Sequence, residues 1–204
     1  MSVPENTPIV SKAVVIILAA GSSSRLGSPK QLLTVHDKGL LQHTIDCAKT
    51  ATAEPVIVVL GANRELIKKE LNLKEVVIAE NEEWKSGLAS SIHKGIEALT
   101  KVSPSADAAI LMVCDQPFVS AELLNDLLRK QKETGKAIVA SSYDNTLGTP
   151  ALFHSSLFPE LAALEGDTGA KILLKKYGNQ LSSVPFIRGG IDIDTGEDYR
   201  NLGK

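Results

Sequence analysis

The sequence lacks the features of secreted, metal-stapled and membrane proteins. Among its 204 residues there are only two cysteines, Cys47 and Cys114, and no pair of cysteines or histidines has the spacing of a zinc site. We interpret both cysteines as reduced, buried thiols. The first ten residues contain Pro4 and Pro8 but no basic segment, and the apolar run after them is too short to span a bilayer. These absences predict a cytoplasmic protein without a membrane partner.

A strong excess of charge of either sign is also absent. The chain has 22 Lys and Arg against 24 Asp and Glu, for a formal net charge of −2. No cluster of basic residues forms the positive face that nucleic-acid-binding proteins present. We therefore expect no nucleic-acid partner. Any cationic site must be local, which suits a small phosphorylated substrate.

Short apolar runs alternate with stretches of helical periodicity along the first two thirds of the chain. Strands are predicted at residues 14–18, 56–60, 76–79, 108–113 and 137–140, and helices at 40–50, 64–71, 88–100 and 121–134. This alternation predicts an α/β fold with a mostly parallel sheet covered on both faces. We expect one domain over residues 1–204, with residues 1–12 as a loose tail.

The last third departs from this alternation. A short strand is predicted at 149–153, helices at 155–163 and 168–177, a strand near 184–187, and a closing helix that begins near Gly196. Asp167 is a good N-cap for the helix at 168–177.

The loop at residues 18–30 is the most informative segment of the sequence. It follows an apolar run at 13–17 and combines tiny residues with Arg25 and Lys30. Glycine and serine let the backbone approach a ligand and direct its N–H groups at it, Arg25 can contact two phosphate oxygens, and Lys30 supplies a point charge. The loop lacks the Gly-Lys-Ser/Thr ending of a P-loop and the G-x-G-x-x-G spacing of dinucleotide folds. We interpret it as a triphosphate cradle, the alternative being a solvated turn with incidental charges.

A second segment, residues 81–91, has a similar character. Gly87 and the two serines after it open a helix and offer N–H and hydroxyl groups to a base or phosphate. Trp84 is expected to pack as an ordinary aromatic. Together the two segments and one aspartate give the predicted nucleotide-binding residues: Leu18, Ala19, Ala20, Gly21, Ser22, Ser23, Arg25, Lys30, Asn81, Gly87, Ser90, Ser91 and Asp115. Arg25 and Lys30 are the predicted catalytic residues.

Aspartates follow the strand at 108–113 and lie in the segment at 191–195. Asp115 sits at a strand's carboxyl end, where ligands bind to such sheets, and it can hold Mg²⁺ while phosphates and water complete the shell. Asp192 is the candidate second ligand. Asp194 is the alternative to Asp192, although it can instead cap the closing helix, which has Asp198 in its first turn. Asp115 can likewise be a turn residue.

These residues resemble a known family. Residues 19–33 follow the pattern Ala-Ala-Gly-x-Ser-x-Arg-Leu-Gly-x-Pro-Lys-Gln-Leu-Leu, which is similar to the signature loop of the MobA-like nucleotidyltransferases. Within that family the chain looks closest to the molybdenum cofactor cytidylyltransferases. Four more segments agree with this resemblance: 81–91, 115–117, 166–171 and 192–195.

The resemblance implies a Rossmann-like three-layer αβα sandwich, as in the nucleotide-diphospho-sugar transferases. It also implies a Mg²⁺-dependent transfer of a nucleoside monophosphate from CTP to molybdopterin, with release of pyrophosphate. Ala20 stands where the guanylyl branch usually has glycine, which favours CTP over GTP. The resemblance further implies that Gln116, Thr149 and Asp167 bind the acceptor, although Thr149 replaces the histidine that the family often has.

Two other functions fit the same motifs. One is a sugar- or alditol-phosphate nucleotidyltransferase on the same scaffold. The other is a non-catalytic accessory protein that delivers molybdopterin to a molybdoenzyme apoprotein. The combination of Arg25, Lys30, Asp115 and Asp192 argues against a pure carrier, because a carrier does not need ligands for Mg²⁺.

Overall fold

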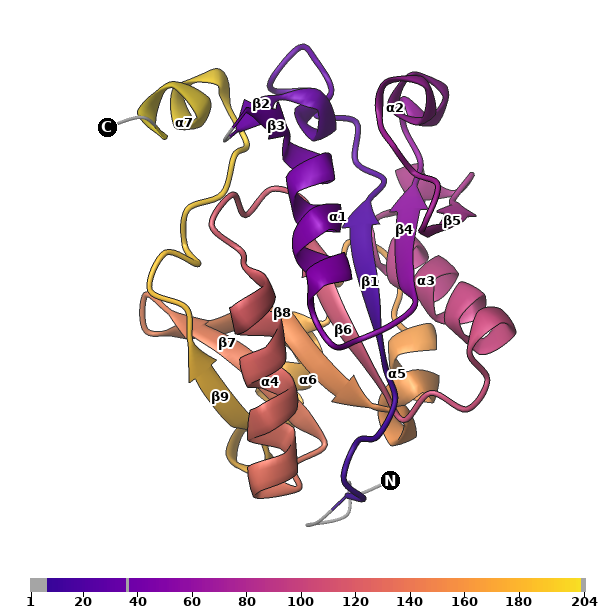
Figure 1. The fold of residues 1–204 in the computed structure, drawn as a ribbon, viewed down its shortest axis with the longest axis vertical. Coiled ribbons are helices and arrows are strands. Elements are labelled where there is room, and N and C mark those ends of the chain that lie inside the picture. The colour runs from indigo at the N-terminus through magenta and orange to yellow at the C-terminus, as the bar shows by residue number, and fades with distance from the viewer. Residues whose placement is uncertain (1–6, 36, 203–204) are drawn as a thin grey trace.

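The computed structural model describes residues 7–35 and 37–202, and its centre is a seven-stranded sheet (Figure 1). The strand order across the sheet is β5-β4-β1-β6-β8-β7-β9. The strands are β1 (Ala13–Ala19), β4 (Val56–Leu60), β5 (Val77–Glu80), β6 (Ala108–Val113), β7 (Ile138–Tyr143), β8 (Thr146–His154) and β9 (Ser182–Pro185). All seven residues of β1 are buried, as expected for a central strand covered on both faces.

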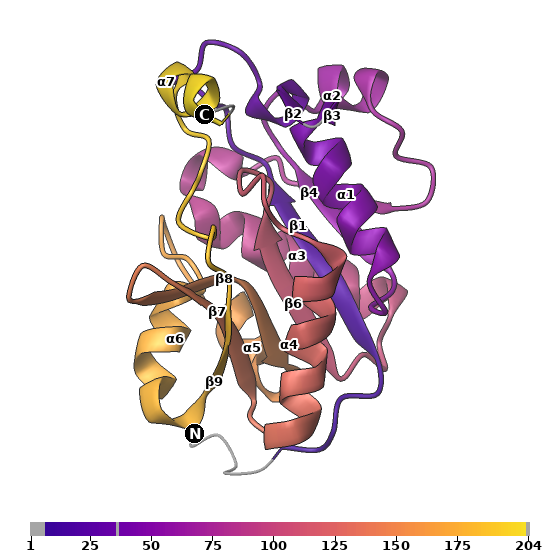
Figure 2. The same ribbon diagram turned by 60° about the vertical axis from the view of Figure 1, so that its left-hand side comes forward.

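Helices cover both faces of this sheet, so the three-layer architecture is confirmed (Figures 1 and 2). Apolar residues of α1 (Leu40–Thr50), α2 (Arg64–Glu70) and α4 (Ala121–Thr134) pack on one face, against Val15 and Ile17 of β1. Those of α3 (Leu88–Val102), α5 (Phe158–Ala162) and α6 (Lys171–Tyr177) pack on the other, against Val14 and Ile16. The alternation of side chains along β1 thus divides the core between two layers.

The sheet is mostly parallel, as predicted, with one exception. Strands β5, β4, β1 and β6 pair in parallel, and β7 pairs in parallel with β9. β8 runs antiparallel to both β6 and β7. Since β1 and β6 are parallel neighbours, their carboxyl ends bring the loop after β1 and Asp115 to the same edge of the sheet.

The C-terminal segment returns to this edge. The short strands β2 (Thr34–Val35) and β3 (Lys38–Gly39) and the closing helix α7 (Gly196–Asn201) lie beside each other there (Figures 1 and 2). Ile193 is fully buried against Val35 and Leu40, and its N–H donates to the carbonyl of Asp115 at 3.0 Å. These contacts place the aspartates on either side of Ile193 next to Asp115.

The structure corrects two of the local predictions and decides between the two roles left open for Asp194. The tail is not loose in its second half, because the N–H of Thr7 donates to the carbonyl of Gly135 and that of Val10 to the Gln131 side chain. Residues 1–6 lie outside the described residues. Asp167 is not a helix N-cap, since α6 begins only at Lys171, after Ala170.

Asp194 does not cap the closing helix either. Thr195 is the N-cap of α7, and its side chain and that of Asp198 form a reciprocal capping box. Asp194 is therefore free to bind elsewhere. In the part of the chain that the structure describes, no helix combines the length and apolar character needed to cross a bilayer.

Candidate active site

A cavity of about 490 Å³ opens at the carboxyl ends of β1 and β6. Its lining combines the loop after β1 with the segments that precede α3 and α6. The lining residues are Leu18, Ala19, Ala20, Gly21, Ser22, Lys30, Gln31, Trp84, Lys85, Gly87, Leu88, Ser91, Val113, Cys114, Asp115 and Asp167. Ten of the predicted site residues are in this set, contributed by four separate parts of the chain.

Gln31 holds the loop after β1 in shape. Its side chain is fully buried, and its amide N–H groups donate to the carbonyls of Ala19 at 2.9 Å and Gly21 at 3.0 Å. Ser23 adopts a left-handed backbone with φ of 56°, and its hydroxyl accepts a hydrogen bond from the N–H of Lys30 at 3.0 Å. The loop is thus braced from within, so its outer surface can face a ligand without rearranging.

We expect Gln31→Met to weaken both the fold and the site. The substitution keeps the volume but leaves two carbonyls without their donor, which costs about 1–3 kcal/mol in the free energy of unfolding. Urea denaturation measures that loss, and a raised KM for the nucleotide would accompany it. Gln180→Met, at an exposed position, is the control. Unchanged urea stability and KM in Gln31→Met would show that the brace has no role.

Lys30 lies at the centre of the charged groups. Its ammonium Nζ is 2.7 Å from Asp115 Oδ2 and 2.9 Å from Asp194 Oδ1, and its side chain is only 14% exposed. Burial alone would lower the pKa of Lys30, but the charge and hydrogen bond of Asp115, with the hydrogen bond of Asp194, raise it above its ordinary value. Lys30 is therefore a fixed positive charge at neutral pH, placed at the cavity wall.

Arg25 lies further out on the same loop. Its guanidinium Nη2 is 3.0 Å from Asp194 Oδ2, and its side chain is 68% exposed. The hydrogen bond from Lys30, together with the charges of Lys30 and Arg25, lowers the pKa of Asp194. Arg25 is absent from the cavity lining, so it reaches a ligand there only by turning away from Asp194.

Asp115 and Asp192 form the pair of carboxylates that the sequence suggested for a metal. Asp192 is an exposed residue, yet partial burial of its carboxylate and the charges of Asp115 and Asp194 raise its pKa to about 6. Asp115 Oδ1 is buried without a hydrogen-bond partner. Asp194 pairs with both Lys30 and Arg25, whereas no ion pair of Asp192 is found among the described residues.

The donor set suits an oxygen-binding divalent cation. Within the ranges 7–35 and 37–202, no three His, Cys, Asp or Glu side chains gather into a metal site. A cation held there would take one or two protein carboxylates and complete its shell with phosphates and water, which is how proteins usually hold Mg²⁺. The partnerless Asp115 Oδ1 is the atom that fits this role best.

The segment before α3 is braced by its own side chains. Asn81 is buried, and its amide donates to the hydroxyls of Ser90 at 2.8 Å and Ser91 at 3.1 Å. Of these three residues only Ser91 lines the cavity. Gly87 has φ of 108°, and a Cβ on it would lie 2.3 Å from the carbonyl oxygen of Gly166, so only glycine fits there.

The three residues predicted to bind the acceptor are divided between two places. Asp167 lines the cavity, next to Gly87. Gln116 and Thr149 lie together outside its lining, with Thr149 Oγ1 3.5 Å from Gln116 Oε1. The side-chain amide of Gln116 also donates to the carbonyl of Gly189 at 2.8 Å.

Six lining residues were not predicted as part of the site: Gln31, Trp84, Lys85, Leu88, Val113 and Cys114. Trp84 packs partly against the core while it lines the cavity, and Lys85 Nζ lies 5.4 Å from its ring centroid. Cys114 is buried, and burial raises the pKa of its thiol to about 12, so it stays protonated at neutral pH. The position of Trp84 next to a glycine-rich segment could have indicated that it lines the site. Cys114 could have been predicted only from its position next to Asp115.

This fold, with a cationic loop after its first strand, is one that nucleotidyltransferases have. The family described as "MobA-like NTP transferase domain" matches residues 15–181, and the chain belongs to that family.

Among its relatives is the nicotine blue oxidoreductase of Paenarthrobacter nicotinovorans, 29% identical over 92% of this chain and 94% of that protein. The bifunctional protein GlmU of Desulfitobacterium hafniense is 30% identical over 93% of this chain, which spans only 38% of GlmU. Among solved structures, Rv0371c of Mycobacterium tuberculosis has a TM-score of 0.82, with 31% identity over 95% of this chain and 98% of that one. Rv0371c has also been solved in complex with manganese.

Proposed function

We propose that the protein transfers the cytidine monophosphate unit of CTP to molybdopterin with the help of Mg²⁺. The observation that carries this proposal is the half-buried Lys30 ammonium on Asp115, at the wall of a cavity lined by the small residues of the loop after β1. The membership of the MobA-like family supports the transferase chemistry, and the cytidylyl and molybdopterin assignments rest on the sequence resemblance.

In the proposed reaction an anionic phosphate oxygen of the acceptor attacks the α-phosphorus of CTP. The bond from that phosphorus to the oxygen bridging to the β-phosphorus breaks, and pyrophosphate leaves. Lys30, Arg25 and the loop's backbone amides stabilise the charge on the phosphates, and the loop fixes their position. No general base is required, because the attacking oxygen already carries a negative charge.

Asp115 and Asp192 would hold the divalent cation. When bound, Mg²⁺ withdraws charge from the phosphate oxygens that complete its coordination. The structure of Rv0371c with manganese supports a divalent cation in a relative of this fold.

We expect Arg25→Ala to lower turnover while leaving the fold intact. Loss of a charge that contacts the transferring phosphoryl group costs about 10²-fold in kcat/KM. The exposed ion pair with Asp194 contributes little to stability, so the melting temperature should stay within a degree or so of the parent. Steady-state kinetics and thermal unfolding measure the two. Normal turnover in a folded Arg25→Ala protein would show that Arg25 has no role in the reaction.

We expect Ala20→Gly to raise the use of GTP without abolishing that of CTP. Ala20 is buried and lines the cavity, so its methyl group narrows the space open to a purine. A clash with one methyl group is worth about 1–3 kcal/mol, or 10–200-fold in specificity. Ratios of kcat/KM for the two nucleotides test this. Equal values of kcat/KM for CTP and GTP in the unmutated protein would contradict the preference for CTP.

The acceptor is tested by pyrophosphate release from CTP with molybdopterin and with sugar and alditol phosphates as alternatives. Release with molybdopterin alone supports the proposal. Release with a sugar or alditol phosphate alone favours a sugar- or alditol-phosphate nucleotidyltransferase. CTP and molybdopterin binding without any release favours a carrier that delivers the cofactor to a molybdoenzyme apoprotein.

A further inference from the structure

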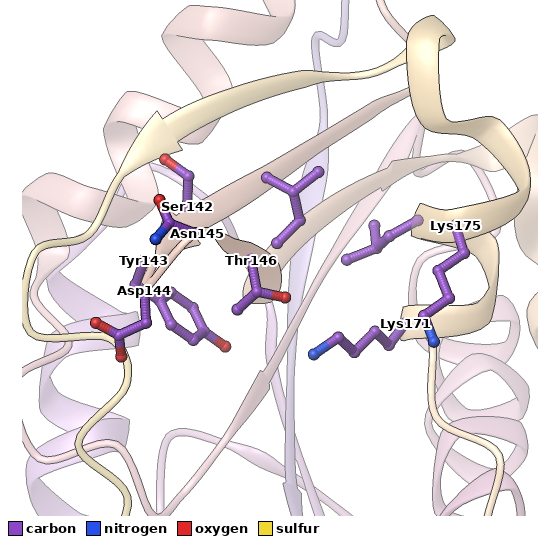
Figure 3. Close-up of a pocket in the computed structure, with 9 residues that line it drawn as sticks. Ser142, Tyr143, Asp144, Asn145, Thr146, Lys171 and Lys175 are labelled. Carbon is purple, nitrogen blue, oxygen red and sulfur yellow. The ribbon is translucent and has the colours of Figure 1, made fainter.

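The structure contains a second cavity, of about 540 Å³, between the β7–β8 hairpin and α6 (Figure 3). Tyr143 and Thr146 of the hairpin face Lys171 and Lys175 of α6 across it. We propose that this cavity binds the acceptor, with Lys171 and Lys175 as the cationic contacts to a phosphate monoester. The inference rests on the proposed function, which requires a phosphorylated acceptor but does not place it.

The two lysines form an uncompensated positive pair. They lie one helical turn apart and therefore project from the same face of α6. Neither has a carboxylate within ion-pair distance in the part of the chain that the structure describes, whereas the adjacent Lys176 pairs with Glu160 at 2.8 Å. Figure 3 shows Lys171 extending from α6 toward Thr146 and Tyr143. Two free ammonium groups beside a hydroxyl suit a phosphate dianion.

Tyr143 connects this cavity with the carboxylates of the active site. Burial raises the pKa of Tyr143 and the charge of Asp192 adds to the rise, while a hydrogen bond with the Gln116 side chain opposes it. The Gln116 side-chain amide donates to the carbonyl of Gly189 at 2.8 Å, and a Cβ on Gly189 would lie 2.5 Å from the Tyr143 ring. Tyr143 therefore lines the acceptor cavity and also packs beside the segment that follows Asp115.

Close packing fixes the Tyr143 ring in this position. The ring lies edge-on to Phe186, with centroids 6.1 Å apart and an interplanar angle of 85°. A Cβ on Gly148 would be 2.0 Å from the Tyr143 hydroxyl, so the close approach depends on glycine. Asp144 also lines the cavity, and in the view of Figure 3 its carboxylate lies on the other side of Tyr143 from the lysines.

The rest of the lining indicates what the acceptor carries besides phosphate. Leu147 and Leu174 add an apolar wall between the hairpin and α6. The volume is within the range of sites for small organic ligands, which combine an apolar lining with a few polar anchors. The cavity therefore fits a phosphate monoester with a ring system, such as a pterin, better than a bare polyol phosphate.

The probe for this site is 4-methylumbelliferyl phosphate, an aromatic phosphate monoester, titrated into ¹⁵N-labelled full-length protein. We expect saturable shifts of backbone amide signals at residues 142–147 and 171–175, and weaker shifts with 4-methylumbelliferone, which lacks the phosphate. The double variant Lys171→Gln/Lys175→Gln should raise the apparent Kd about tenfold or more. Lys176→Gln is the matched control and should bind as the parent does.

A parallel titration with CTP and MgCl₂ separates this inference from the proposed function. CTP should shift amides at residues 18–31 in the parent and in both lysine variants, and a failure there counts against the function. If the phosphate ester shifts no amide signals at the hairpin and α6, or if its Kd is unchanged in the double variant, this cavity does not bind the acceptor. Neither result would count against nucleotide binding at the loop after β1.

Discussion

Replacing Lys30 by methionine is expected to lower kcat/KM for CTP by about 10²–10³-fold. Methionine retains most of the buried stem and removes only the ammonium group. That group is the one cation of the loop held in the cavity wall, 2.7 Å from Asp115. Steady-state kinetics with saturating acceptor measure the effect.

Thermal unfolding of the same variant distinguishes a catalytic from a structural role. The pKa of Lys30 is raised in the folded state, so its ion pairs stabilise the fold at pH values below its unfolded pKa, including neutral pH. Lys30→Met should therefore lose some stability at pH 7 but remain folded. Lys38→Met, which removes an exposed ion pair with Asp46, is the control and should retain activity. If Lys30→Met has nearly the kinetics of the parent, the loop after β1 does not act as a triphosphate cradle.

Asp192→Asn is expected to abolish turnover and yet to raise the melting temperature in the absence of divalent metal. The folded-state pKa of Asp192 is about 6, above its ordinary value, because of partial burial and the charges of Asp115 and Asp194. The folded state then binds more protons than the unfolded state between about pH 4 and 6, so this group costs stability as the pH rises through that window. Asparagine removes the repulsion, and the gain should appear at pH 7 and vanish near pH 4.

Metal dependence completes the test of Asp192. MgCl₂ or MnCl₂ should raise the melting temperature of the parent by mass action but leave that of Asp192→Asn unchanged. Glu197→Gln, an exposed substitution in the first turn of α7, is the control and should respond to metal as the parent does. A variant that is less stable at pH 7 and still stabilised by metal would show that Asp192 is not a ligand.

The central part of the fold was predictable because its strands are buried on both faces. Continuous apolar runs gave β4 and β6 to the residue, and helical periodicity gave α1 and α4 with the same bounds. The glycine- and serine-rich loop after such a strand then predicted where phosphates bind. Local patterns sufficed wherever burial and periodicity agreed.

The C-terminal third was harder to predict because its structure depends on distant partners. The strand predicted at 149–153 extends to Thr146–His154 because it pairs with both β6 and β7. Asp144 and Asn145, each with positive φ, form the hairpin turn, and this pair was a usable signal. The cavity beside Lys171 needs that hairpin, so it could not be found from spacing alone.

The role of Asp194 shows the same limit. A carboxylate just before a predicted helix is typical of a cap, but Asp194 binds Lys30 and Arg25, which lie 164 and 169 positions away. Capping passes to Thr195, one residue further along. The choice between capping and ion pairing depends on the C-terminal segment lying beside the loop after β1, which local sequence patterns do not show.

The central claim, nucleotidyl transfer, is tested most directly with CTP labelled at the α-phosphate, incubated with molybdopterin and MgCl₂. We expect the label to move to the pterin, one pyrophosphate to appear for each label transferred, and both to slow by about 10²–10³-fold in Lys30→Met. Binding of both substrates by a folded protein without any transfer of label would contradict it.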